Sequence, residues 1–428
     1  MARLDTAISA PRSALQSGSY RLYLGGSLLH HTGEWMDMVA LNWVILQGTQ
    51  SPLHLALLNA CRLVPAFLLS IPAGVLADRF DRRRLLIGLH AGMAGCTLVL
   101  AYVLASGLPF AVVALVVVVR SILAALDLPI RSAFIPQLVP AANLTSAIAL
   151  HTAVLNICRM IGPAVAGFLL SHTDAADLIL AHGLGTMAVC LSLVSIPHRA
   201  RAIAPRAAGG NGAMAEALQF IRRDPMVRTL LTLAVVPMLF GFPYTAMLPV
   251  FAQDLLHAGP AGFGLLLSVS ALGALGGSLW LSRGREPREP GKWLIGSTLG
   301  FGVALLLFVM STNLAVAMVT IFLVGMTGQL YRTMSRVTLH QHVPDHLRGR
   351  IVSMALMDRG FIPLGSLLAS MATGWWGAFG AGMMMGSGCI VVTLLLMSLH
   401  RGLWIREERG GERNEPGRMD FTAKERHG

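Results

Sequence analysis

The stretch Gly74-Val-Leu-Ala-Asp78-Arg79-Phe-Asp81-Arg82-Arg83-Arg84 is a short charged turn between two long apolar runs. The runs cover residues 54–76 and 84–105. Because an α-helix rises about 1.5 Å per residue, about 20 apolar residues cross the hydrocarbon core of a bilayer. The stretch therefore predicts two transmembrane helices joined by a tight, basic loop.

The same alternation of apolar run and polar turn repeats along the whole chain. Apolar residues make up 54% of the 428 residues and charged residues 13%, whereas soluble domains average about 25% charged residues. We expect twelve spans, at residues 22–46, 54–76, 84–105, 109–130, 148–170, 177–197, 227–253, 262–282, 293–311, 314–337, 351–371 and 377–400. The predicted fold class is an all-α integral membrane protein.

The basic residues indicate how the chain is oriented. Its net charge is +12, but the arginines lie in the turns between apolar runs rather than on one face. Alternate turns, at 47–53, 106–108, 171–176, 254–261, 312–313 and 372–376, contain neither Lys nor Arg. By the positive-inside rule, both termini lie in the cytoplasm. We expect a multi-pass protein of the inner (cytoplasmic) membrane that contacts lipid and does not bind nucleic acid.

A long polar break divides the chain in two. Residues 198–226 contain a Gly-rich run and then, at 213–223, a short amphipathic helix. We expect a first half at 1–197, a cytoplasmic linker at 198–226, a second half at 227–400 and a polar cytoplasmic tail at 401–428. A weak repeat supports this division, since Arg159-Met-Ile-Gly-Pro163 is matched by Arg359-Gly-Phe-Ile-Pro363.

Enzyme signatures are missing from the sequence. It contains no GxxxxGK[ST] phosphate-binding loop, no HExxH and no GxSxG. The five cysteines lie singly within apolar runs, a pattern that suggests neither disulfides nor a zinc site. We expect a protein that is not an enzyme and that holds no metal or cofactor.

The charged turn at Gly74–Arg84 resembles the signature loop of the major facilitator superfamily, G-x-L-A-D-R-x-G-R-R/K, with Asp81 in place of the usual Gly. Together with Gly33-Glu34-Trp35-Met36, it is most similar to the branch that contains the enterobactin exporter and the macrolide efflux proteins. The resemblance implies two pseudo-symmetric halves of six helices each, transport by alternating access, and a monomer.

The resemblance also implies a gating role for the loop. Asp78 would contact the start of the eleventh helix, and a charge relay would run through Arg82 to Asp127. Gly74 lets helices approach closely, and Arg79 and Arg83 would lie near anionic headgroups. The alternative is a plain basic loop with a helix-capping Asp.

A second motif, Gly162-Pro163-x-x-x-Gly167, resembles the Gly-Pro motif of proton-coupled exporters in this superfamily. Proline removes a backbone hydrogen bond and bends a helix, and glycines permit close packing. A kinked packing helix without a coupling role is the alternative.

Ionisable residues inside the spans predict a polar cavity, because charges are costly in lipid. Glu34 and Asp37 share one helix face, and with Asp358 they are the candidates for proton coupling. The candidates for lining a substrate cavity are Trp35, Arg120, Asn156, Arg159, Gln329, Arg332 and Arg359. The alternative is a set of permanent ion pairs, such as Glu34 with Arg120 or Arg159.

These features predict a secondary active transporter, driven by the proton gradient, that exports a small hydrophobic or amphipathic molecule. A siderophore, a macrolide-like compound or a mixed range of drugs would fit. An importer of the same fold, and a membrane scaffold or sensor that does not transport, are the alternatives.

Overall fold

The computed structural model describes residues 13–197, 212–283, 289–344, 347, 351 and 354–399, except for the side chains of 70–79, 212–215, 217, 290 and 356. The described part of the chain consists of helices and contains no β-strand. Helices satisfy their own backbone hydrogen bonds, as a chain in lipid requires. The all-α fold class predicted from the sequence is confirmed.

The first group of helices forms one bundle in which each helix packs against its neighbours. Its members are α1 (Gly18–Thr49), α2 (Pro52–Arg79), α3 (Arg82–Ala105), α4 (Phe110–Phe134), α5 (Leu144–Leu169) and α6 (Ala175–Ser195). Within it, α1 packs on α5 and α6, α3 packs on α4 and α6, and α2 packs on α4.

The second group begins after α7 (Gly212–Arg223), which corresponds to the amphipathic helix expected at 213–223. Its first span is broken into α8 (Pro225–Val236), the π-helical turn η4 (Pro237–Gly241), α9 (Tyr244–Val250) and the π-helical turn η5 (Phe251–Leu255). The prolines at 237, 243 and 249 explain these breaks, because proline cannot donate the helical hydrogen bond. The remaining members are α10 (Gly259–Arg283), α11 (Pro290–Val309), α12 (Leu314–His342), η6 (Leu356–Gly360) and α14 (Phe361–Leu399).

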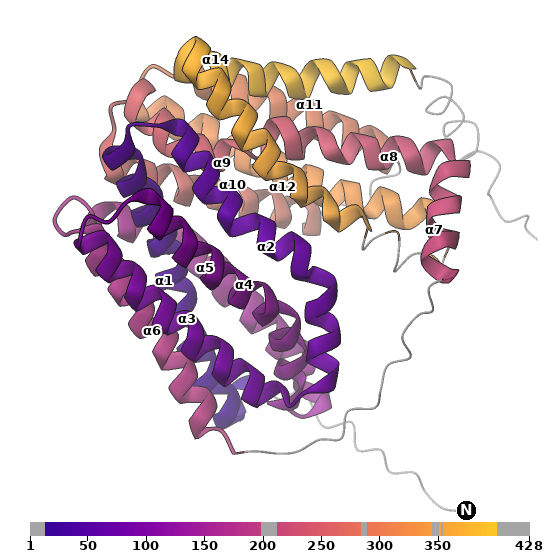
Figure 1. Ribbon diagram of the computed structural model, residues 1–428. Helices are drawn as coiled ribbons and strands as arrows, with labels where there is room; N and C mark the ends of the chain where they lie inside the picture. The colour runs from indigo at the N-terminus through magenta and orange to yellow at the C-terminus, as the bar shows by residue number, and fades with distance from the viewer. Residues whose placement is uncertain are drawn as a thin grey trace, which may run out of the picture.

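Helix α14 consists of two helical arms joined at a sharp bend. Its backbone turns at Gly377, where φ is 69°, a value that favours glycine. Figure 1 shows its two arms folding back on each other. Ten described segments are long and apolar enough to cross a membrane, with the whole of 357–399 counted as one and α1 excluded. Twelve spans result when α1, which has 32 residues, and the two arms of α14 are counted separately.

The two groups meet at one end and diverge toward the side where α7 lies (Figure 1). The contacts between them join α5 to α10 and α2 to α14. Where the groups meet, Gln47 donates a hydrogen bond to Gln253 at 3.1 Å. This end carries the turns at 50–51, 170–174 and 256–258, which contain no Lys or Arg. We call it the arginine-free end.

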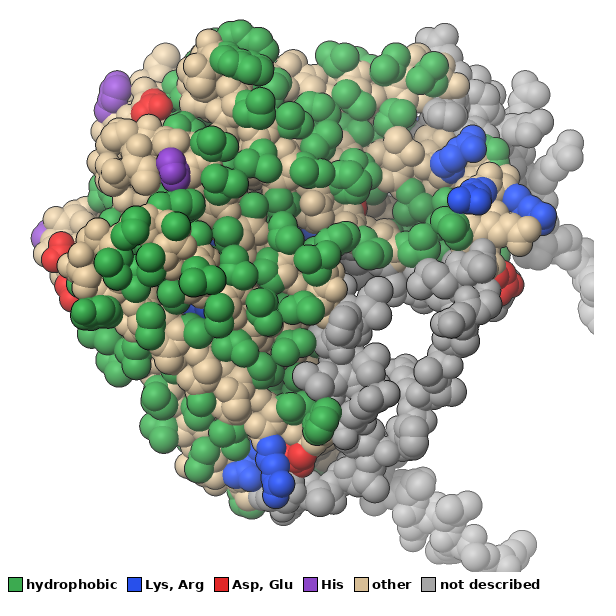
Figure 2. All heavy atoms as spheres, viewed as in Figure 1, with side chains coloured by type: hydrophobic (Ala, Val, Ile, Leu, Met, Phe, Trp, Pro, Cys, Tyr) green, Lys and Arg blue, Asp and Glu red, His purple; other side chains and the backbone are tan. Residues whose placement is uncertain are grey.

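The outer surface suits a bilayer. Figure 2 shows hydrophobic side chains covering the walls of the molecule, whereas Lys and Arg gather near the ends of helices. Many large apolar residues on the outer faces are exposed, including Leu68, Leu115 and Phe168. In lipid such exposure costs nothing, because hydrocarbon replaces water around these side chains.

Candidate functional site

The signature loop ties together the ends of three helices. Asp81, which replaces the usual Gly, accepts a hydrogen bond from the backbone N–H of Arg84 at 2.8 Å and so caps the start of α3. Arg82 donates to the carbonyl of Ala133 at the end of α4, at 3.0 Å. Arg83 donates to the carbonyls of Leu193 and Val194 at the end of α6, both at 2.8 Å. Cations stabilise the free carbonyls at helix C-termini.

The remaining loop positions are only partly visible. Only the backbone is described at Gly74, Asp78 and Arg79, so contact of Asp78 with the eleventh helix stays a prediction. Asp127, the expected end of the relay, lies 3.3 Å from Arg131 and 3.7 Å from His90. Arg82 does not contact Asp127 here, and the relay stays a prediction.

The Gly-Pro motif of α5 forms the contact between the groups. A Cβ on Gly167 would lie 2.5 Å from the carbonyl oxygen of Pro260, and one on Gly264 of α10 would lie 2.1 Å from that of Pro163. The backbone N–H of Ala164 donates to the hydroxyl of Ser268 at 3.0 Å. Gly162 instead packs against Trp35 within the first group. The motif thus lets α5 and α10 approach at backbone distance.

Asp37 is the centre of a buried ion cluster. Arg120 binds its two carboxylate oxygens at 3.0 and 2.7 Å, and Arg62 binds one of them at 2.6 Å. The Asp37 side chain is 2% exposed. Two guanidinium groups around one carboxylate form a strong, charge-assisted arrangement. We call Asp37, Arg62 and Arg120 the paired cluster; sequence reasoning had offered Glu34 as the partner of Arg120.

A cavity of about 680 Å³ adjoins this cluster and is lined by α1, α2, α3, α4 and α6. Glu34, Trp35 and Met38 of α1 form one wall, and Ser121 and Leu128 of α4 form another. Such a volume falls within the usual range for small-molecule sites, about 300–1,000 Å³. The wall is partly apolar and partly charged, as an amphipathic ligand requires.

Glu34 sits at the cavity end of a polar chain. Its side chain is 56% exposed and accepts from Nδ1 of His31 at 2.8 Å. Arg131 donates to Nε2 of the same imidazole, and Asp127 binds Arg131 in turn. Because Nε2 of His31 accepts, the proton of the neutral ring lies on Nδ1 and points to Glu34. The chain joins an accessible acid on α1 to buried groups on α4.

Histidines surround this chain, and sequence reasoning missed them. The ring of His30 lies 4.9 Å from His31, 5.3 Å from His90 and 5.4 Å from His182. All four are buried. Neither ring nitrogen of His182 has a hydrogen-bond partner among the described residues. One sequence feature could have identified them, because each of these histidines lies inside an apolar span, where ionisable residues are rare.

Three of these residues resemble a metal site without fitting one well. Ligand atoms of His30, His31 and Glu34 all lie within 4.8 Å of one another. However, Nδ1 of His31 is bonded to Glu34 and its Nε2 accepts from Arg131. A metal on Nδ1 needs that lone pair, while Arg131 occupies the other. The donor set therefore suits proton exchange better than metal binding.

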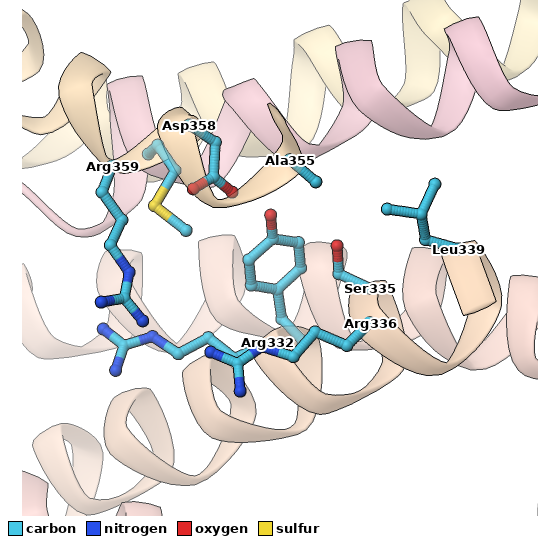
Figure 3. Close-up of a pocket in the computed structure, with 9 residues that line it drawn as sticks. Arg332, Ser335, Arg336, Leu339, Ala355, Asp358 and Arg359 are labelled. Carbon is cyan, nitrogen blue, oxygen red and sulfur yellow. The ribbon is translucent and has the colours of Figure 1, made fainter. Parts of the chain in front are cut away.

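The other predicted cavity residues lie where the groups face each other. Arg159 of α5 lies over the ring of Trp35, 5.9 Å from its centre, and Arg332 of α12 lies 4.0 Å from the centre of Phe242. Arg359 and Asp358 belong to η6 and line a small pocket with Arg332 (Figure 3).

Two of the predicted polar cavity residues form no hydrogen bond with the other site residues that the structure describes. Asn156 is exposed on α5 and donates to the carbonyl of Thr152 at 3.0 Å. Gln329 is half-buried on α12, and its side chain forms no hydrogen bond within the described residues. The structure thus brings Glu34 and Asp37 together with Arg120, and Arg159 with Arg332, while Asn156 and Gln329 lie apart from both sets of contacts.

Known proteins share both the sequence and the fold. The family described as transmembrane secretion effector matches residues 9–413. The chain is 30% identical to the staphyloferrin A transporter of Staphylococcus aureus over 391 residues, which cover 91% of this chain and 98% of the relative. It is 23% identical to macrolide efflux protein A of Streptococcus pyogenes over 359 residues, 82% of this chain and 88% of the relative.

Among solved structures, a mutant of the nucleoside transporter NupG superposes with a TM-score of 0.72 at 12% identity, covering 90% of this chain and 100% of that one. At this identity the likeness shows the fold alone.

Proposed function

Because the chain belongs to the transmembrane secretion effector family of the major facilitator superfamily, a family of transporters and not of enzymes, we propose that it exports a small molecule by alternating access, driven by proton entry. Two observations support alternating access. The groups touch at the arginine-free end and diverge at the other (Figure 1). The contact between α5 and α10 is made by glycine and backbone atoms, which can slide without repacking large side chains.

The observation that carries proton coupling is Glu34, an acid on the cavity wall bonded to a buried histidine. An acid that exchanges its partner between conformations binds a proton in one and releases it in the other. Asp37 suits this role less well, because two arginines already bind its carboxylate. It is better placed to hold α1, α2 and α4 together.

The orientation we propose places both termini and α7 in the cytoplasm, in a bacterial cell membrane. The Arg-rich turns at the α7 side support it, by the positive-inside rule. The conformation described here would then be open toward the cytoplasm, the state in which an exporter loads. The relatives named for staphyloferrin A and macrolides suggest a siderophore or drug-like cargo.

Inside-out membrane vesicles test this proposal directly. Respiration acidifies their interior, and an exported substrate that exchanges for protons discharges the pH gradient, which a weak-base fluorophore reports. We expect at least one of staphyloferrin A, a macrolide and a cationic dye to discharge it when the protein is present. Matched vesicles that carry Glu34→Gln should not respond. Discharge that is equal in both would contradict coupling through Glu34, and uptake in the opposite direction would favour an importer.

A further inference from the structure

A group of arginines at the junction of the two helix groups has one acid, Asp358, beside it among the described residues. Arg332, Arg336 and Arg359 line the same small pocket, and Figure 3 shows their guanidinium groups gathered on one side of it. Arg332 also lies close enough to Arg159 of α5 for the two charges to repel each other. We call these four residues the arginine cluster. Asp358 is the one acid that lines the pocket with them.

The cluster differs from the other arginines inside the spans of the first group. Arg62 and Arg120 bind Asp37, and Arg131 binds Asp127. None of the four cluster arginines forms an ion pair with a residue that the structure describes. Cations gathered within a membrane protein repel each other and are costly unless a counter-charge joins them. The cluster is therefore built to receive an anion from outside the chain.

Aromatic rings hold two of these cations in place. Arg332 lies 4.0 Å from the ring centre of Phe242, and Arg159 lies 5.9 Å from that of Trp35. Stacking on a ring fixes a guanidinium while leaving its N–H groups free at the edges. Free N–H pairs bind carboxylates in a bidentate manner. The rings also offer apolar surface to the remainder of a ligand.

The internal repeat places two arginines at matching positions. Arg159 stands four residues before Pro163 in α5, and Arg359 stands four residues before Pro363 in α14. Both lie near Arg332. Arg159 comes from the first half, and Arg332 and Arg359 come from the second. A ligand with anionic groups at two ends can therefore bind both halves at once.

We propose that the arginine cluster is an anion site and that the transported molecule carries at least two carboxylates. This rests on the proposed transport function but not on proton coupling. The same chemistry could come from an anionic lipid headgroup, particularly at Arg336 and Arg359, which are exposed. A lipid, however, has no need of an arginine from each half, and we assign the site to a soluble polycarboxylate.

The test uses the full chain in nanodiscs of purely zwitterionic lipid and citrate as the probe, measured by calorimetry. We expect citrate to bind and acetate, with one carboxylate, to bind at least tenfold more weakly. Arg332→Gln combined with Arg359→Gln should weaken citrate binding at least tenfold. Arg283→Gln, at the exposed end of α10, is the matched control and should bind as the unmodified chain does.

Further variants keep the test decisive if the double variant does not fold. Arg332→Lys keeps the charge but loses the bidentate geometry, and we expect weaker citrate binding from it. Arg336→Gln changes an exposed residue, and we expect it to weaken citrate binding by a smaller factor. Citrate binding that is unchanged in all three variants would overturn the proposal. The proposal would also be overturned if the protein were stabilised against unfolding only when anionic lipid is added to the nanodiscs, and if this stabilisation depended on the same arginines.

This experiment separates the anion site from proton coupling. Arginine-dependent citrate binding, together with vesicles in which Glu34→Gln changes nothing, would keep the anion site and reject the coupling. Loss of coupling in Glu34→Gln, together with arginine variants that bind citrate normally, would do the reverse.

Discussion

In the paired cluster, Arg62 and Arg120 share one buried carboxylate. In the arginine cluster, Arg332 and its neighbours form no ion pair with a described acid, although Asp358 lines their pocket. The two regions lie in the same protein and use the same side chain. The difference shows that a cation within a transporter either stabilises the helix packing through a buried ion pair or remains available to bind an anionic ligand. Its partners decide which.

The largest effect is expected from breaking the paired cluster. Asp37→Asn removes the charge that Arg62 and Arg120 share and leaves two buried cations unpaired. Removing one partner of a buried ion pair costs about 3–5 kcal/mol. We expect a marked fall in the thermal unfolding midpoint in detergent. Asp174→Asn, in an exposed turn, is the control. Equal unfolding midpoints for both variants would show that the paired cluster does not stabilise the fold.

The contact between α5 and α10 joins the two helix groups. Gly264→Ala would place a Cβ 2.1 Å from the carbonyl oxygen of Pro163 and force the helices apart. Overpacking of this kind costs about 1–3 kcal/mol. We expect easier labelling of a cysteine at Gln253 by an impermeant thiol reagent, in a background without native cysteines. Gly95→Ala, which meets no atom within 4 Å, should leave the labelling unchanged.

A double-mutant cycle can sharpen the account of Asp127. In this conformation its partner is Arg131, not Arg82. Coupling between Asp127→Asn and Arg131→Gln should lie within about 0.5–3 kcal/mol in unfolding free energy. Asp127→Asn and Arg82→Gln should be additive in stability but non-additive in transport rate, if the relay forms during the cycle. Additive transport losses would reject the relay.

The smallest effect on stability is expected in the arginine cluster. Arg332→Gln removes the contact with Phe242 but also relieves repulsion with Arg159 and Arg359. The net cost should be below about 1 kcal/mol, the value of one partly exposed cation–π contact. A cost as large as that of Asp37→Asn, measured in the same unfolding assay, would mean that Arg332 has a structural partner after all.

The sequence was sufficient for the fold because lipid imposes a simple pattern. Apolar runs of the right length predicted the spans from α1 to α12 within about five residues. The eleventh span was expected at residues 351–371, but α14 begins at Phe361, after η6. The turn expected at 372–376 is helical, and the chain bends instead at Gly377, where the twelfth span was expected to begin. The segment at 225–255 was expected as a single span, and it forms one, but as a broken helix. The π-helical turns within it were not predicted, because they depend on how neighbouring residues accommodate each proline.

The site was only half predictable. Glu34 and Asp37 stand out because acids are rare in apolar runs, but they share a helix face, and only the tertiary packing gives Asp37 to Arg120 and Glu34 to His31. His30, His90 and His182 come from three helices, so their gathering into one cluster has no local signature. The lack of partners around Arg332 is likewise a property of three-dimensional contacts alone.

The central claim is that a proton on Glu34 drives export, and reconstituted flux tests it most directly. Purified protein and Glu34→Gln would be compared in proteoliposomes, first with an imposed pH gradient and then as gradient-free exchange of labelled substrate for unlabelled. We predict that the variant keeps exchange, because its cavity and the paired cluster are intact, and loses the acceleration by the gradient. Full gradient-driven flux in Glu34→Gln would contradict the account and move the coupling residue elsewhere, with Asp358 as the next candidate.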